Sequence, residues 1–75
     1  MSSAYAMINT MPDKMETVLE MIKGINGVQE AYMLYGVYDI IAEVKAGGIE
    51  DLKAMVLNIR KLKYVTSTLT LLIVS

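Results

Sequence analysis

The chain has 75 residues, a net charge of −1, and neither Cys nor His, so it has room for one small domain and no disulfide or ordinary zinc site. Hydrophobic residues make up 55% of it and charged residues 20%. Because so short a chain buries only about 60–65% of the surface that its unfolded form exposes, we expect self-association to supply the missing stability. Residues 1–75 are expected to form a single effector-binding and oligomerisation domain.

The same composition disfavours several classes of function. A chain of net charge −1 lacks the Lys/Arg stripe that nucleic-acid binding needs. No positively charged segment precedes an apolar one at the start, and the apolar closing segment is shorter than the roughly 20 residues that span a bilayer. We therefore expect a cytoplasmic protein without membrane contact. Without His, Cys or a Gly-rich phosphate motif, we expect no catalytic residues, cofactor or metal.

Apolar periodicity indicates a strand and then a helix in the first third of the chain. Ala4–Asn9 is predicted to be a short strand. Residues 13–23 are predicted to be a helix, because apolar residues recur there every three or four positions. Asp13 and Glu16 have the spacing of a capping box, and Gly24 fits the left-handed position that follows a helix.

The middle of the chain is predicted to form a β-hairpin. Val28–Tyr35 and Tyr38–Ala46 have the composition of strands, and Gly36 and Val37 between them suit a tight turn. In the second of these strands the even-numbered residues from 38 to 44 share one face. A second helix is expected over residues 49–62 and a closing strand over residues 65–74.

The resulting order, βαββαβ, predicts a ferredoxin-like α+β fold. Two helices of similar length can cover only one face of a four-stranded antiparallel sheet. The other face is then left without a cover, although Ile41 and part of the apolar run over residues 69–73 must lie on it. Two copies placed sheet to sheet, or edge to edge, would bury this apolar surplus.

The hairpin turn is the candidate ligand site, with Tyr35, Gly36, Val37, Tyr38 and Asp39. Free backbone N–H groups at a glycine turn can hold a carboxylate, and Asp39 can accept a hydrogen bond from an ammonium group. Together they would suit a zwitterion. The alternative is a purely structural turn, in which the tyrosines pack at strand ends and Asp39 is a solvated acid.

Alternating threonines on the closing strand also have two interpretations. Thr66, Thr68 and Thr70 share one face of that strand. They are either residues with a preference for strands on a half-wet surface, or hydroxyl groups that line a polar cleft.

Taken together, these segments resemble the ligand-binding domain of the leucine-responsive and asparagine-responsive (Lrp/AsnC) regulators, over essentially the whole chain. Residues 36–39 (G-V-Y-D) are similar to the G-x-Y-D turn of that family, and the strand over residues 40–44 follows it. Residues 27–31 are similar to the segment that leads into the second strand. Val65 with the two threonines resembles the V-x-x-T-x-T start of the last strand. One departure is Tyr64, where the family usually has glycine.

The resemblance implies a homodimer formed through the sheets, and dimers joined into a ring such as an octamer. It also implies that a small amino-acid-like effector binds between dimers, with Tyr35 to Asp39 at one wall and Thr68 and Thr70 nearby. Full regulators carry an N-terminal helix-turn-helix, for which this chain has no room. We therefore expect a stand-alone sensor that does not bind DNA and modulates transcription indirectly.

Two other functions stay open. The chain could be an adaptor subunit that joins a full-length Lrp/AsnC regulator without a ligand of its own. It could also be a small dimeric ferredoxin-like enzyme with a cavity between the sheet and the helices. A deep pocket lined by Tyr5, Tyr32 or Met33 would favour the enzyme.

Overall fold

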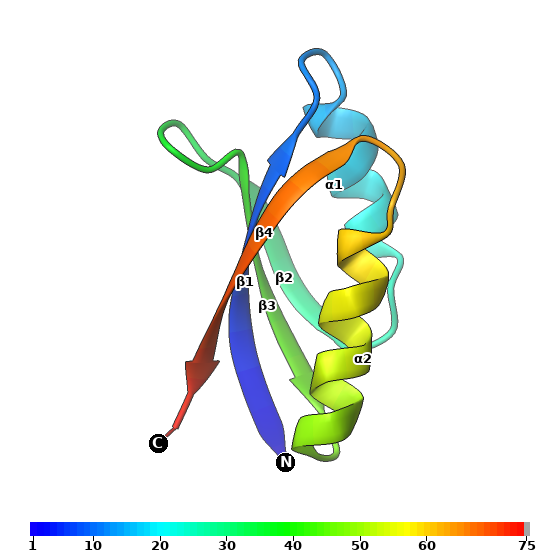
Figure 1. Cartoon of the computed structure of the whole chain (residues 1–75), viewed down its shortest axis with the longest axis vertical. Coiled ribbons are helices and arrows are strands. Elements are labelled where there is room, and N and C mark those ends of the chain that lie inside the picture. The colour runs from blue at the N-terminus through cyan, green and yellow to red at the C-terminus, as the bar shows by residue number, and fades with distance from the viewer. Residues whose placement is uncertain (75) are drawn as a thin grey trace.

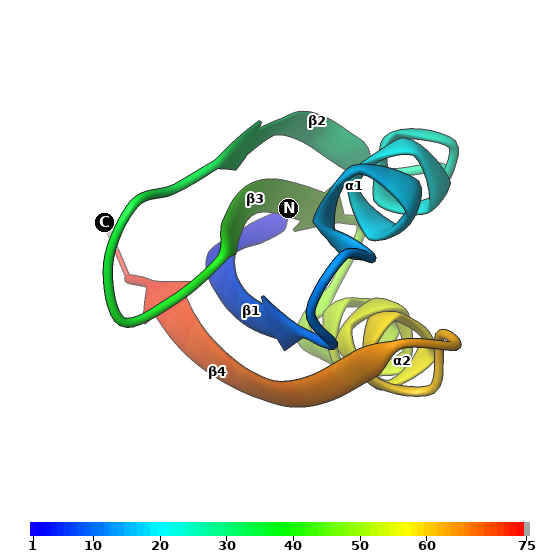
Figure 2. The same ribbon diagram turned by 90° about the horizontal axis from the view of Figure 1, so that it is seen from above.

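The computed structural model describes residues 1–74 and confirms the βαββαβ order and the ferredoxin-like α+β fold (Figure 1). The elements are β1 (Ser2–Thr10), α1 (Met15–Lys23), β2 (Val28–Met33), β3 (Ile40–Ala46), α2 (Ile49–Arg60) and β4 (Val65–Ile73). The four strands form one antiparallel sheet in the order β2-β3-β1-β4. Both helices lie on one side of this curved sheet (Figure 2). Among the described residues, no helix has both the length and the apolar character needed to cross a membrane.

The core fills the space between the sheet and the two helices. Along the two central strands, alternate residues point to the helices, as predicted for β3. Several of these residues are alanines, whose small side chains let the helices approach the sheet closely. The buried residues are Ala4, Ala6 and Ile8 of β1, Ala31 of β2, Ile40, Ala42 and Val44 of β3, Val18, Leu19 and Ile22 of α1, and Leu52 and Ile59 of α2.

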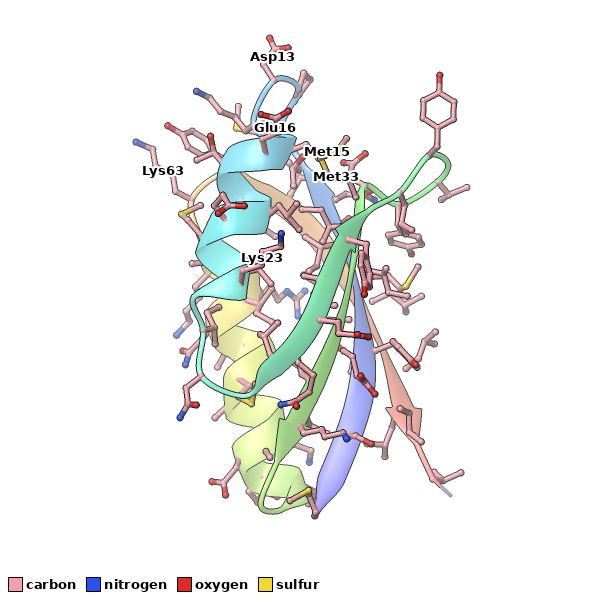
Figure 3. The ribbon with its side chains drawn as sticks, turned by 180° about the vertical axis from the view of Figure 1, so that it is seen from behind. Asp13, Met15, Glu16, Lys23, Met33 and Lys63 are labelled. Carbon is pink, nitrogen blue, oxygen red and sulfur yellow. The ribbon has the colours of Figure 1, made fainter. Side chains whose placement is uncertain are left out.

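The start of α1 differs from the prediction. The Lys14 N–H donates to the carbonyl oxygen of Met11 at 3.1 Å, and Asp13 has a φ of 69°. Pro12 and Asp13 therefore occupy the two central positions of a type II β-turn. Lys14 takes the N-cap position without a side-chain hydrogen bond, while Asp13 stands at the tip of the loop and Glu16 on the first helical turn (Figure 3). The predicted capping box is wrong, because the turn places Asp13 outside the N-cap position.

The end of α1 also differs from the prediction. Gly24 has a φ of −81°, which is right-handed, and the left-handed residue is Gly27, with a φ of 99°. The Val28 N–H donates to the carbonyl oxygen of Ile25 at 3.2 Å, so a second turn with a left-handed third residue leads into β2. The chain continues past the helix for one more turn before it reverses, and this turn requires the left-handed residue later than expected.

The end of α2 has the same turn with a tyrosine in place of the glycine. The Val65 N–H donates to the carbonyl oxygen of Leu62 at 3.2 Å, and Tyr64 has a φ of 75°. A left-handed conformation costs a residue with a Cβ about 1–2 kcal/mol. The ammonium groups of Lys14 and Lys63 lie 4.7 and 5.1 Å from the centroid of the Tyr64 ring, and these contacts offset part of that cost. Tyr64 thus occupies in this turn the left-handed position that Gly27 occupies in the turn after α1.

We expect Gly27→Ala to lower the free energy of unfolding by about 2 kcal/mol, because an added Cβ meets both a left-handed φ and a close backbone atom. This Cβ would lie 2.8 Å from the carbonyl oxygen of Lys45. The Lys45 backbone cannot easily move away, because its N–H donates a hydrogen bond to the carbonyl oxygen of Gly27. Urea denaturation measures the change. Gly24→Ala is the matched control: its φ is right-handed and its nearest neighbour is 3.5 Å away. A loss at Gly24 equal to that at Gly27 would contradict this assignment of the two turns.

The face of the sheet away from the helices carries an apolar row across all four strands. The register places Tyr32 of β2 beside Ile41 of β3, Ile41 beside Met7 of β1, and Met7 beside Leu69 of β4. Leu71 adds to the row on β4 and is half exposed, as Leu69 and Tyr32 are. We call these five residues the open-face row. The prediction that Ile41 and part of the last strand lie on the uncovered face is confirmed.

The strand β4 forms one edge of the sheet, with β1 as its neighbour. Between residues 65 and 74 the sequence contains no charged residue, no proline and no glycine. Proteins usually protect an exposed edge strand with lysines, prolines or bulges. A register shift interrupts the pairing of β4 with β1 between Val65 and Ser67. From Ser67 to Ile73 the outer edge of β4 is an unprotected pairing surface in the isolated protomer.

Candidate functional site

The predicted ligand turn is a wider loop than expected. The strand β2 ends at Met33 and β3 begins at Ile40, so residues 34–39 connect them, and the predicted two-residue turn at Gly36 and Val37 is wrong. A single backbone hydrogen bond, from the Leu34 N–H to the Asp39 carbonyl oxygen at 2.8 Å, closes the base of this loop. The loop extends away from the helices (Figure 1).

Asp39 ties the loop to the end of β1. Its N–H donates to the carbonyl oxygen of Ile8 at 3.0 Å. Its Oδ2 accepts a hydrogen bond from the backbone N–H of Thr10 at 2.8 Å and a longer one from the Thr10 hydroxyl at 3.4 Å. The register between β1 and β4 shifts between Asn9 and Thr10, and Asp39 provides a partner for the amide at this irregularity. Sequence reasoning missed Thr10, because no local pattern signals a bond between residues 29 positions apart.

We expect Asp39→Ala to lower the free energy of unfolding by about 1–2 kcal/mol, because it leaves the partly buried Thr10 amide without its acceptor. Asp39→Asn retains a side-chain oxygen and should lose less than half as much. Thermal unfolding of the two variants against the parent checks this difference. Equal losses for both would show that the charge of Asp39, and not its hydrogen bond, stabilises the loop.

The tip of the loop is exposed in the protomer. The side chains of Tyr35 and Val37 are almost completely accessible, and nothing lies within 4 Å of the position of a Cβ on Gly36. Tyr38 is partly buried. Within the described part of the chain, the backbone N–H groups of residues 35–38 donate no hydrogen bond. The loop thus presents free donors beside two apolar side chains, with the second carboxylate oxygen of Asp39 also without a hydrogen-bond partner there.

The threonines of β4 lie elsewhere. Thr68 pairs with Ile8 and Thr70 with Ala6, and because both partners are buried against the helices, the threonines face the helical side of the sheet. Thr70 borders a groove between α2 and β4, whereas the loop of residues 34–39 projects to the opposite side (Figure 2). Within one protomer the structure does not bring the two halves of the predicted site together.

A small hollow on the open face is lined by two tyrosines and two glutamates. Tyr5, Tyr32 and Ile41 border it with Glu30 and Glu43, and its volume is about 200 Å³. The two glutamates face each other across β2 and β3, next to a register shift in β2. The negative charge of Glu30 raises the pKa of the Tyr32 phenol. This hollow lies on the open face and not between the sheet and the helices, so it lacks the position expected for the enzyme alternative.

The sequence and the fold together identify the family. The family model of the Lrp/AsnC ligand binding domain matches residues 3–75. The chain belongs to this family. This Lrp/AsnC ligand-binding domain has the fold and the apolar open face that the order of its elements predicted.

Solved structures support this assignment. TTHA0845 from Thermus thermophilus is 30% identical with a TM-score of 0.94, and the match covers 100% of this chain and 95% of that one. FFRP-DM1 is 31% identical with a TM-score of 0.95, covering 99% of this chain and 100% of that one. AsnC from E. coli is 24% identical with a TM-score of 0.91, but this chain, 99% of which is covered, spans only 51% of its length, so that match supports the fold alone. The search of curated proteins found no match.

Proposed function

We propose that this Lrp/AsnC domain is a non-enzymatic cytoplasmic sensor that binds an amino acid or a related small metabolite and changes its assembly in response. The open-face row carries the proposal: a 75-residue chain leaves apolar side chains on all four strands in contact with water. Burial of apolar surface is worth about 25 cal/mol per Å². The sheet of a second copy of this chain is the surface that we propose to cover the open-face row.

The first step is the pairing of two protomers through their open faces. Apolar sheet faces pack about 10 Å apart with interdigitating side chains. In a dimer with a two-fold axis, the open-face row of one protomer packs against the same row of its partner. In such a pair the exposed parts of Tyr32, Leu69 and Leu71 become buried. Dimers then join into a ring such as an octamer.

The second step is ligand binding at the loop. The unpaired N–H groups of residues 35–38 suit the carboxylate of an amino acid. The free oxygen of Asp39 suits its ammonium group, while Oδ2 stays with Thr10. Tyr35 and Val37 are almost completely exposed in the protomer, so both side chains are available for contact with a neighbouring dimer. A ligand in that position stabilises the ring only to the extent that it binds the ring better than free dimers.

The threonines enter this proposal through a second protomer. Thr68 and Thr70 lie on the helical side of β4, whereas the loop of their own chain projects to the opposite side (Figure 2). Only a neighbouring dimer that presents its edge strand to the loop would complete the predicted site. The effect on transcription is then indirect, through the change in assembly or through a partner that the ring contacts.

Sedimentation velocity with each of the twenty amino acids tests the proposal. We expect one or a few of them to shift the protein to the larger assembly, and at about one hundred times the Kd to stabilise it by about 2.7 kcal/mol. Tyr35→Ala and Val37→Ala should weaken the response without affecting folding, because both side chains lie outside the core. The matched control is Met11→Ala, half exposed in the turn before α1. If no amino acid changes either the assembly or the melting temperature, the sensing role is wrong.

Co-assembly with a full-length Lrp/AsnC regulator is the second candidate, because the open-face row suits any sheet of the same family. The domain would then act as an adaptor that needs no ligand. Affinity capture from its own cells distinguishes the two roles. Recovery of a full-length regulator in stoichiometric amount favours the adaptor, and recovery of this chain alone argues against it.

A further inference from the structure

An apolar groove runs along the outer side of α2, where this helix meets the edge strand β4. Its volume is about 290 Å³, just below the range for small-molecule pockets, roughly 300–1,000 Å³. The residues that matter here are Ile49, Lys53, Leu57 and Arg60 of α2 and Thr70 and Leu72 of β4. None of these residues belongs to the loop of residues 34–39.

Part of the apolar surface of α2 and β4 stays exposed in the groove and does not pack into the core. Leu52 and Ile59 anchor α2 on the sheet and are almost fully buried. Ile49, Leu57 and Leu72 remain 40%, 48% and 48% exposed along the groove. These three side chains pack only part of their surface within the protomer, and a hydrocarbon ligand between them would remove the rest from water.

The charges along this groove all have one sign. Lys53 and Arg60 lie on its rim, and no acidic residue lines it. The Lys53 ammonium is 3.8 Å from a carboxylate oxygen of Glu50, in a pair whose side chains are 71% and 85% exposed, and such a pair contributes little. Arg60 forms no ion pair within residues 1–74. Its guanidinium group can hold a carboxylate in a two-pronged hydrogen bond.

We propose that this groove binds an aliphatic carboxylate of short to medium chain length. The hydrocarbon chain lies along Leu57 and Leu72, the carboxylate is held by Arg60, and the Thr70 hydroxyl provides a second polar contact. The positive charges on the rim determine the class of ligand. An aliphatic amine would contact the same apolar residues, but its ammonium group would be repelled by Lys53 and Arg60. This site lies on the helical side of the sheet, away from the open-face row. It shares Thr70 with the proposed amino-acid site, whereas its other residues lie outside that site, so octanoate binding can be measured separately from the response to amino acids.

Methyl NMR with octanoate, kept below its micelle-forming concentration, tests the proposal. We expect saturable shifts of the methyl groups of Ile49, Leu57 and Leu72, and weaker binding of octylammonium by about tenfold or more, the factor expected for loss of a charge-assisted hydrogen bond. Arg60→Gln should weaken octanoate by a similar factor and leave 1-octanol unchanged. Lys61→Gln is the matched control, because it removes the same charge from the neighbouring exposed residue outside the groove.

A second variant separates binding from folding. Leu57→Asp places a carboxylate in the groove at a half-exposed position, so the protein should still fold but lose octanoate binding. Equal affinity for octanoate and octylammonium would overturn the proposal. Octanoate shifts confined to the methyl groups of Leu69 and Leu71 would also overturn it, since they report the open face. So would groove signals that shift with protein concentration alone, because a second copy would then be the occupant.

Discussion

Ile40→Ala is expected to lower the free energy of unfolding by about 3–4 kcal/mol, within the range for a fully buried isoleucine. Ile40 is completely buried, lies on β3 next to the central strand β1, and pairs with Ile8, which is also completely buried. Its truncation leaves a cavity that both helices and the sheet are too closely packed to fill. A domain of this size has only about 5 kcal/mol to lose, so much of the variant should be unfolded at 37 °C.

The neighbouring residue provides the control for that result. Ile41 is on the same strand but points to the open face, where it is only partly buried. Ile41→Ala removes the same atoms and should cost less than about 1.5 kcal/mol in the isolated protomer, since water already reaches its site. Urea denaturation compares the two variants at a protein concentration low enough that sedimentation reports monomers. Equal losses would contradict the assignment of the two faces.

Ile41→Asp is expected to weaken self-association by at least one hundredfold. Ile41 lies in the middle of the open-face row, between Tyr32 and Met7. A two-fold interface contains the new carboxylate twice, and burying each one without a partner costs several kcal/mol. Because about 1.4 kcal/mol is a factor of ten in Kd, the protein should sediment as a monomer at micromolar concentration.

Asn58→Asp is the matched control for this variant. It adds the same charge at an exposed position of α2 on the opposite side of the sheet. Circular dichroism should report folded protein for both variants, since neither site belongs to the buried core. A full-sized assembly of Ile41→Asp would rule out the open face as the dimer interface.

The elements that sequence reasoning predicted are those whose signals repeat within a few residues. The alternation along β3 and the apolar spacing in α1 each report one face that must be buried. Both features hold in the structure, and so does the side of the sheet on which Ile41 lies.

The predictions that were wrong depended on distant or backbone effects. Asp13 has the right spacing for a capping box, but Pro12 places it in a left-handed turn. The loop of residues 34–39 is wider than a two-residue turn, and at its base Asp39 bonds to Thr10 on another strand. The pairing of Glu30 with Glu43, which was not predicted, follows from a register shift in β2. No pattern in a single strand determines which residues lie opposite it.

The uncharged edge of β4 has a consequence for the lifetime of the separated protomer. A row of free amide and carbonyl groups flanked by threonine and leucine is a template onto which any extended chain can add. In a variant whose protomers stay separate, no neighbouring chain covers this template, so the protein should precipitate or form fibrils on storage. Introducing one lysine at an outward position of β4 would slow that process. The resistance of this protein to aggregation thus depends on its quaternary structure.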